Sequence, residues 1–71
     1  MAFIDTVAER LAVDAFEQAQ ATHDPDLVDA ISKQLGTTSP TLQEVYDTAI
    51  RYLRAEARAR EMMQERLGRM R

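Results

Sequence analysis

The sequence contains no cysteine and no tryptophan, and its 71 residues include only two glycines, two prolines and one histidine. Without cysteine, disulfide bonds and thiolate metal sites are excluded. The single histidine, His23, also excludes a histidine-rich metal cluster. No apolar run approaches the ~20 residues of a membrane span, and the first residues lack the positive charge of a signal peptide. We therefore expect a cytoplasmic protein with no membrane partner, folded as a single small helical domain over residues 1–71.

Positive charge is scarce in the first fifty residues and abundant in the remainder. Residues 1–50 carry nine carboxylates against Arg10 and Lys33, a balance of −7, whereas residues 51–71 carry seven arginines against three glutamates, a balance of +4. This asymmetry predicts two ends with different tasks, or two ends that attract each other across a dimer. Lys33 is the only lysine, and the preference for arginine and alanine is typical of GC-rich bacterial genomes.

Apolar residues at three- and four-residue steps predict three helices, at about residues 3–21, 25–35 and 40–68. Asp24 and Ser39 each precede a proline, which is the usual order of a helix cap and a first helical residue. Gly36 predicts a left-handed residue that ends the second helix. The long third helix would span roughly 40 Å, which is more than the other two can cover.

The fold class we predict is therefore all-α. Two shorter helices pack on the first half of a long, projecting C-terminal helix. The expected core is made of the larger apolar side chains on the inward faces: Ile4, Val7, Leu11, Phe16, Leu27, Ile31, Leu35, Leu42, Val45, Ala49 and Leu53.

The third helix also carries a heptad pattern, in which positions at alternating steps of three and four residues form a seam for a coiled-coil partner. Most of these positions are apolar. The predicted interface consists of Tyr46, Ala49, Leu53, Glu56, Arg60, Met63, Leu67 and Met70. A second copy of the chain, or another protein, would cover this seam.

The two charged members of the seam favour one orientation in a homodimer. In a parallel pair, Glu56 would face Glu56 and Arg60 would face Arg60. In an antiparallel pair centred near Arg58, Glu56 faces Arg60 of the other chain instead. The alternative is an exposed helix end, supported by Glu–Arg and Asp–Arg pairs four residues apart.

Residues 28–47 resemble a helix-turn-helix motif, with apolar residues at Ile31, Leu35, Leu42 and Val45 and a glycine at Gly36. The resemblance implies that the second helix of the motif enters the major groove of DNA. The residues facing the bases would be Ser39, Thr41, Gln43 and Glu44. This segment is acidic, however, and DNA affinity depends largely on Lys and Arg that neutralise phosphates. A structural helix corner explains the same pattern.

Catalytic and cofactor chemistry have little support in the sequence. Nucleophilic or acid–base catalysis needs a positioned nucleophile, base or carboxylate pair. His23 lies among Asp24, Asp26 and Asp29, but helix capping explains these acids, and the spacing does not fit a calcium loop. We therefore expect no enzyme activity, no cofactor and no metal, and predict a small interaction module that acts as a regulator or adaptor.

Overall fold

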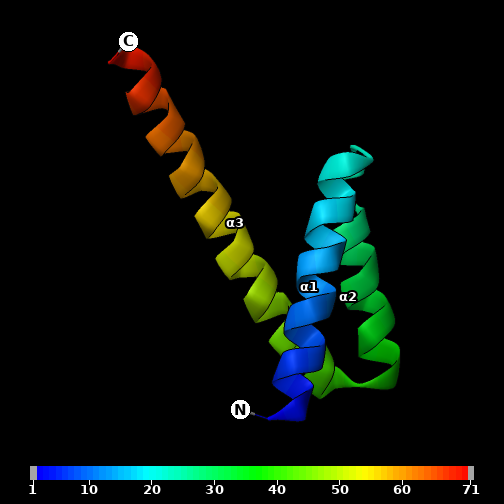
Figure 1. Ribbon diagram of the computed structural model, residues 1–71. Coiled ribbons are helices and arrows are strands. Elements are labelled where there is room, and N and C mark those ends of the chain that lie inside the picture. The colour runs from blue at the N-terminus through cyan, green and yellow to red at the C-terminus, as the bar shows by residue number, and fades with distance from the viewer. Residues whose placement is uncertain (1, 71) are drawn as a thin grey trace.

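The computed structural model describes residues 2–70, which form the helices α1 (Phe3–Ala21), α2 (Leu27–Thr38) and α3 (Pro40–Arg69). α1 and α2 lie side by side in opposite directions, while the first half of α3 contacts both and its second half projects away (Figure 1). The molecule measures 50 × 29 × 13 Å along its principal axes. The predicted all-α fold, with two shorter helices on the first half of a long third one, is confirmed.

The boundaries of α1 and α3 agree with the prediction to within one residue, whereas those of α2 do not. Pro25 and Asp26 form a turn before α2, in which the side chain of Asp24 accepts a hydrogen bond from the N–H of Asp26 at 3.2 Å. At the start of α3, Ser39 caps the helix as predicted, because its Oγ accepts from the N–H of Leu42 at 3.2 Å and Pro40 follows it directly.

The prediction that Gly36 adopts a left-handed conformation is wrong. Gly36 lies inside α2, and no glycine in residues 2–70 has a positive φ. The left-handed residue is His23, with a φ of 55° at the end of α1. There the N–H of Asp24 donates to the carbonyl of Ala19 at 2.9 Å, and the N–H of His23 to that of Gln20 at 3.4 Å. This is a Schellman motif, with His23 in the position that glycine usually occupies.

The core differs from the predicted set because alanines occupy its centre. The residues buried within the described chain are Ala8, Ala12, Ala15, Val28, Tyr46 and Ile50. Eight of the predicted core residues are half-buried against this cluster, and Ile4, Val7 and Leu27 are half-buried elsewhere. Three alanines on one face of α1 allow close approach of the neighbouring helices, which places the larger side chains at the edges of the interface rather than at its centre.

Tyr46 is the one large side chain that is fully buried in residues 2–70. Its hydroxyl donates a hydrogen bond to the carbonyl oxygen of Val28 at 2.9 Å, so the polar end of the side chain is satisfied and connects α3 to α2. Burial raises the pKa of this hydroxyl, and the nearby carboxylates of Asp47 and Asp29 raise it further. The contact joins the middle of the packed half of α3 to the first turn of α2.

Contact between α3 and the other helices ends near residue 57. Ala57 is the last half-buried residue of α3, and residues 58–70 are all exposed. The helix continues through this segment without a covering neighbour (Figure 1). The chain therefore has a packed body and a projecting tail, which we define as residues 58–70.

Candidate functional site

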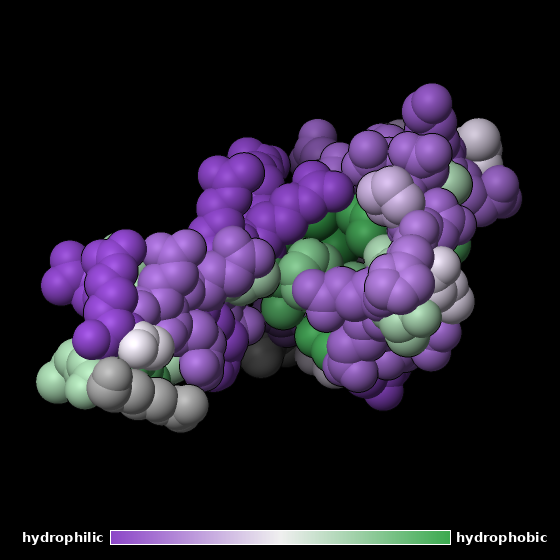
Figure 2. All heavy atoms as spheres, turned by 90° about the horizontal axis from the view of Figure 1, so that it is seen from above, coloured by the Kyte–Doolittle hydropathy of each residue, from purple (hydrophilic) through white to green (hydrophobic). Residues whose placement is uncertain are grey.

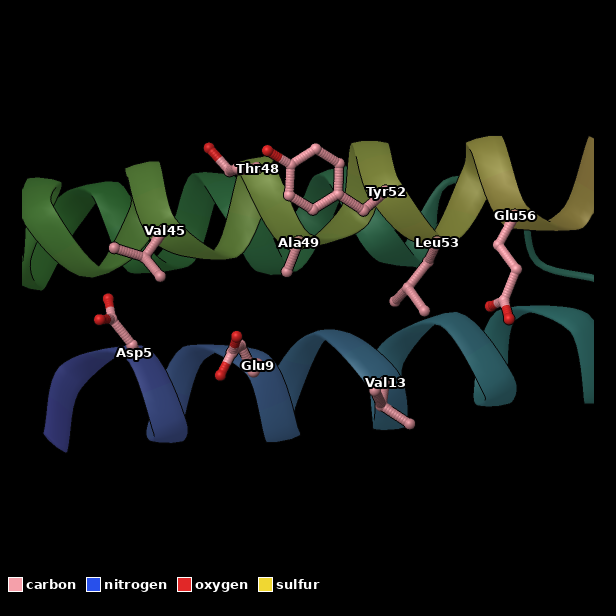
Figure 3. A pocket seen from close by; sticks show the side chains of 9 residues that line it. All are labelled: Asp5, Glu9, Val13, Val45, Thr48, Ala49, Tyr52, Leu53 and Glu56. Atoms are coloured by element: carbon pink, nitrogen blue, oxygen red, sulfur yellow. The ribbon is translucent and has the colours of Figure 1, made fainter. Parts of the chain in front are cut away.

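The face of the α1–α3 pair that points away from α2 is uncovered. Figure 3 shows the α1–α3 pair from close by, with α2 behind α3. An open groove of about 690 Å³ runs between the N-terminal half of α1 and the packed half of α3. We call it the α1–α3 groove.

The lining of the α1–α3 groove is apolar at its base and acidic at its margins. α1 contributes Asp5, Glu9 and Val13. α3 contributes Val45, Thr48, Ala49, Tyr52, Leu53 and Glu56. In Figure 3 the carboxylates of Asp5 and Glu9 point towards α3, and that of Glu56 points towards α1. The groove therefore combines an apolar surface with three negative charges and no lining cation.

The groove carboxylates on α1 are not paired with any cation in the described part of the chain. Within residues 2–70, no ion pair includes Asp5 or Glu9. Glu56 is paired instead with Arg60 of its own helix, at 3.0 Å between Oε2 and Nη2. Both members of this pair are exposed, so the pair supports the helix only weakly. The negative field of the groove is left largely uncompensated.

The second candidate feature is an apolar stripe on the tail. The side chains of Met63 and Leu67 are about half exposed, and that of Met70 is 82% exposed. Shallow hollows lie beside them, one lined by Ala59, Met62 and Arg66 together with Met63 and Leu67. The surrounding charge is positive, because residues 57–70 carry four arginines against two glutamates.

The tail stripe and the α3 side of the groove lie on one face of the same helix. Steps of four and three residues connect Val45, Ala49, Tyr52, Glu56, Ala59, Met63 and Met70, with Arg66 at the remaining position. Tyr52 is 73% exposed although it lies beside the packed body. A continuous, mainly apolar surface therefore runs along the outside of α3 from the groove to the end of the tail.

The structure divides the predicted seam into two parts. Tyr46 lies in the core, where a second chain cannot reach it in this fold. Ala49 and Leu53 are half-buried in the groove, and Glu56 lies at its margin. The remaining members are on the tail: Arg60, Met63, Leu67 and Met70. Sequence reasoning missed Val45 and Tyr52, which a heptad frame shifted by one residue would have included, and the three groove residues of α1.

The residues proposed for base contacts lie at the corner between α2 and α3. The side chain of Ser39 is occupied by its capping bond, and the amide of Gln43 donates to the carbonyl of Ser32 at 2.9 Å. Thr41 and Glu44 are exposed. α2 extends to Thr38, so Ser39 alone separates the two helices. DNA binding by this corner stays a prediction.

A further hollow lies where α1 ends and α2 begins, lined by Phe16, Ala19, Gln20, His23, Pro25, Val28 and Arg54. From above, hydrophobic residues are visible in the depression between the projecting α3 and the α1–α2 pair (Figure 2). Arg54 closes one side through an ion pair with Asp29 at 3.7 Å. Among residues 2–70, no three His, Asp or Glu side chains are grouped so that they could hold a metal ion.

No helix within residues 2–70 has the length and apolar character required to cross a membrane. No protein-family model matches the chain, and comparisons with curated proteins and with solved structures find no significant similarity.

Proposed function

We propose that this protein is a small, non-enzymatic helical interaction module, a regulator or adaptor that pairs with a second copy of itself through α3. The observation that supports the proposal is the exposed apolar stripe of the tail, formed by Met63, Leu67 and Met70. Full burial of one Met or Leu side chain contributes roughly 1.5–3 kcal/mol. A partner that covers the stripe would therefore gain several kcal/mol that the single chain does not use.

An antiparallel arrangement of two copies of α3 pairs the seam residues of the packed half with those of the tail. With the pair centred near Arg58, Ala49 lies opposite Leu67 and Leu53 lies opposite Met63. Met70 has no accessible partner in this register, because Tyr46, which the sequence placed opposite it, is buried in the core. Apolar residues then meet apolar residues on both sides of the centre.

The oligomeric mass over a range of protein concentrations tests the proposal. We expect sedimentation equilibrium to show a dimer that dissociates on dilution. Met63→Asp combined with Leu67→Asp should yield a monomer with unchanged helical circular dichroism, because both side chains lie outside the packed body. Gln64→Asp is a control for one of the two added charges, since it places a single charge about 100° around the helix from Met63. A wild-type mass that stays monomeric at all concentrations would contradict self-association and leave another protein as the partner.

The orientation of the pair is tested separately by charge reversal at its centre. Glu56→Arg alone should weaken the dimer, because the antiparallel register places an arginine opposite Arg60. Glu56→Arg together with Arg60→Glu should restore it. Such an exposed pair contributes only about 0–1 kcal/mol, but like charges disfavour the competing register. If the double variant dimerises no better than the single variant, the antiparallel register is wrong.

A further inference from the structure

We infer that the α1–α3 groove is the docking site for the tail of the second copy, so that each chain inserts residues 58–70 into the groove of the other. This inference rests on the proposed self-association and adds a second surface to it. The proposed function requires only that two copies of α3 pair. The inference also assigns a binding role to α1, through Asp5, Glu9 and Val13.

The geometry of an antiparallel pair places the tail at the groove. The groove extends along α3 from Val45 to Glu56. When two copies of α3 are centred near Arg58, the tail of one runs beside these same residues of the other. α1 lies directly across the groove from them, with Asp5 near Val45 and Glu9 near Ala49 (Figure 3). A helix in this position would contact α1 and α3 together, on the side opposite α2.

The charges of the two surfaces are complementary. The groove presents three carboxylates and no lining cation, and Asp5 and Glu9 form no ion pair within residues 2–70. The tail carries arginines at 58, 60, 66 and 69 against glutamates at 61 and 65. Opposite fields on docking surfaces favour association and select orientation. The acidic groove and the basic tail, which are separated within one molecule, are brought together in the pair.

The apolar surfaces are also complementary in kind. At the groove, Val13 is 41% exposed and Tyr52 is 73% exposed. Both belong to the large hydrophobic side chains that the body leaves exposed. The tail offers flexible methionines, which adapt to irregular surfaces. A fourth helix in the groove would cover these side chains and the stripe of the tail at once, which completes a four-helix arrangement on each side of the dimer.

Two variants of α1 distinguish groove docking from simple pairing of α3. Glu9→Lys changes a charge inside the groove, and Glu17→Lys makes the same change on the same helix outside it. We expect Glu9→Lys to raise the dimer dissociation constant at least tenfold and Glu17→Lys to change it less than twofold. Val13→Asp tests the apolar part and should also weaken the dimer at least tenfold. Circular dichroism confirms that each variant retains its helices.

Complementation between two monomeric variants is the decisive experiment. The chain with both Met63→Asp and Leu67→Asp has an intact groove and a defective tail. The chain with Val13→Asp has a defective groove and an intact tail. A mixture contains one intact groove–tail contact in each heterodimer, so it should dimerise at least tenfold more tightly than either variant alone.

The possible outcomes separate the two proposals. If the wild type dimerises but neither α1 variant weakens it, self-association stands and groove docking is overturned. If the tail and groove variants both weaken the dimer but the mixture shows no gain, the tail does not enter the groove. If the wild type is a monomer, the proposed function fails, and the inference fails with it.

Discussion

The two halves of α3 have similar apolar content but opposite surroundings. In the packed half, Tyr46 and Ile50 are buried against α1 and α2. In the tail, Met63 and Leu67 remain about half exposed. The packed half uses a stripe with the helical period of 3.6 residues, while the outer face of the whole helix follows a period of 3.5. One helix thus carries two apolar faces. The first is packed within the chain, whereas the second is packed only where Val45 and Ala49 contact the core.

Truncation of one apolar side chain in each half should show this difference most strongly. Ile50→Ala removes a buried side chain and should lower the free energy of unfolding by about 2–5 kcal/mol. Met63→Ala removes an exposed one and should change it by less than about 0.5 kcal/mol. Urea denaturation of both variants, at a protein concentration where the chain is monomeric, measures the two effects.

Equal losses of unfolding free energy in Ile50→Ala and Met63→Ala would contradict the contrast between the packed half and the tail. They would mean that the tail packs against the body in solution, in contrast to its exposed position in the structure. Measurement at higher concentration sharpens the result, because Met63→Ala should then lose stability through a weaker dimer, whereas the effect of Ile50→Ala should be nearly unchanged.

The sequence predicted the number, order and approximate length of the helices because its apolar period and its two prolines are strong local signals. It did not predict which face of α3 is buried. The heptad frame selected Tyr46, Ala49 and Leu53, and missed Ile50, although Ile50 follows Tyr46 by one helical turn. The heptad seam and the stripe through Tyr46 and Ile50 both fit the same sequence. Only the positions of α1 and α2 decide which of them is buried.

The alanines of α1 illustrate a second limit. Ala8, Ala12 and Ala15 are the most buried residues of that helix, yet alanine is common on both faces of helices and gives little indication of burial. The α1–α3 groove was equally beyond sequence reasoning. It depends on α2 covering one side of the α1–α3 pair and leaving the other side open, which is a property of the tertiary arrangement.

Removal of the buried hydroxyl tests the packed half more gently. Tyr46→Phe loses the hydrogen bond to the carbonyl of Val28 and should lower the free energy of unfolding by about 1 kcal/mol at neutral pH. Tyr52→Phe is the control, because the hydroxyl of Tyr52 makes no hydrogen bond within residues 2–70. If both variants lose the same stability, the contact between Tyr46 and Val28 does not contribute.

The pH dependence of the same variant has a definite sign. Burial raises the pKa of Tyr46 in the folded protein above the value of about 10 in the unfolded chain. Stability from the neutral hydroxyl is therefore complete below pH ~10 and is lost as the pH rises through the folded pKa. The phenylalanine variant does not titrate, so the difference between the wild type and Tyr46→Phe should shrink above pH ~10. A difference that grows with pH would contradict the assignment.

The two glycines offer the smallest and most local comparison between the body and the tail. Alanine in place of a helical glycine gains up to about 1 kcal/mol. At Gly68 a Cβ would meet nothing within 4 Å, so Gly68→Ala should increase helicity and leave the body unaffected.

At Gly36 the Cβ would lie 2.8 Å from Nε2 of Gln43, the amide that donates to Ser32. Gly36→Ala should therefore displace Gln43 and give a net change close to zero. A double-mutant cycle measures the free-energy cost of displacing Gln43. In a Gln43→Ala background, Gly36→Ala should stabilise the protein by about 1 kcal/mol. If Gly36→Ala is fully stabilising in the wild-type background, the close approach of Gln43 to α2 does not constrain that position.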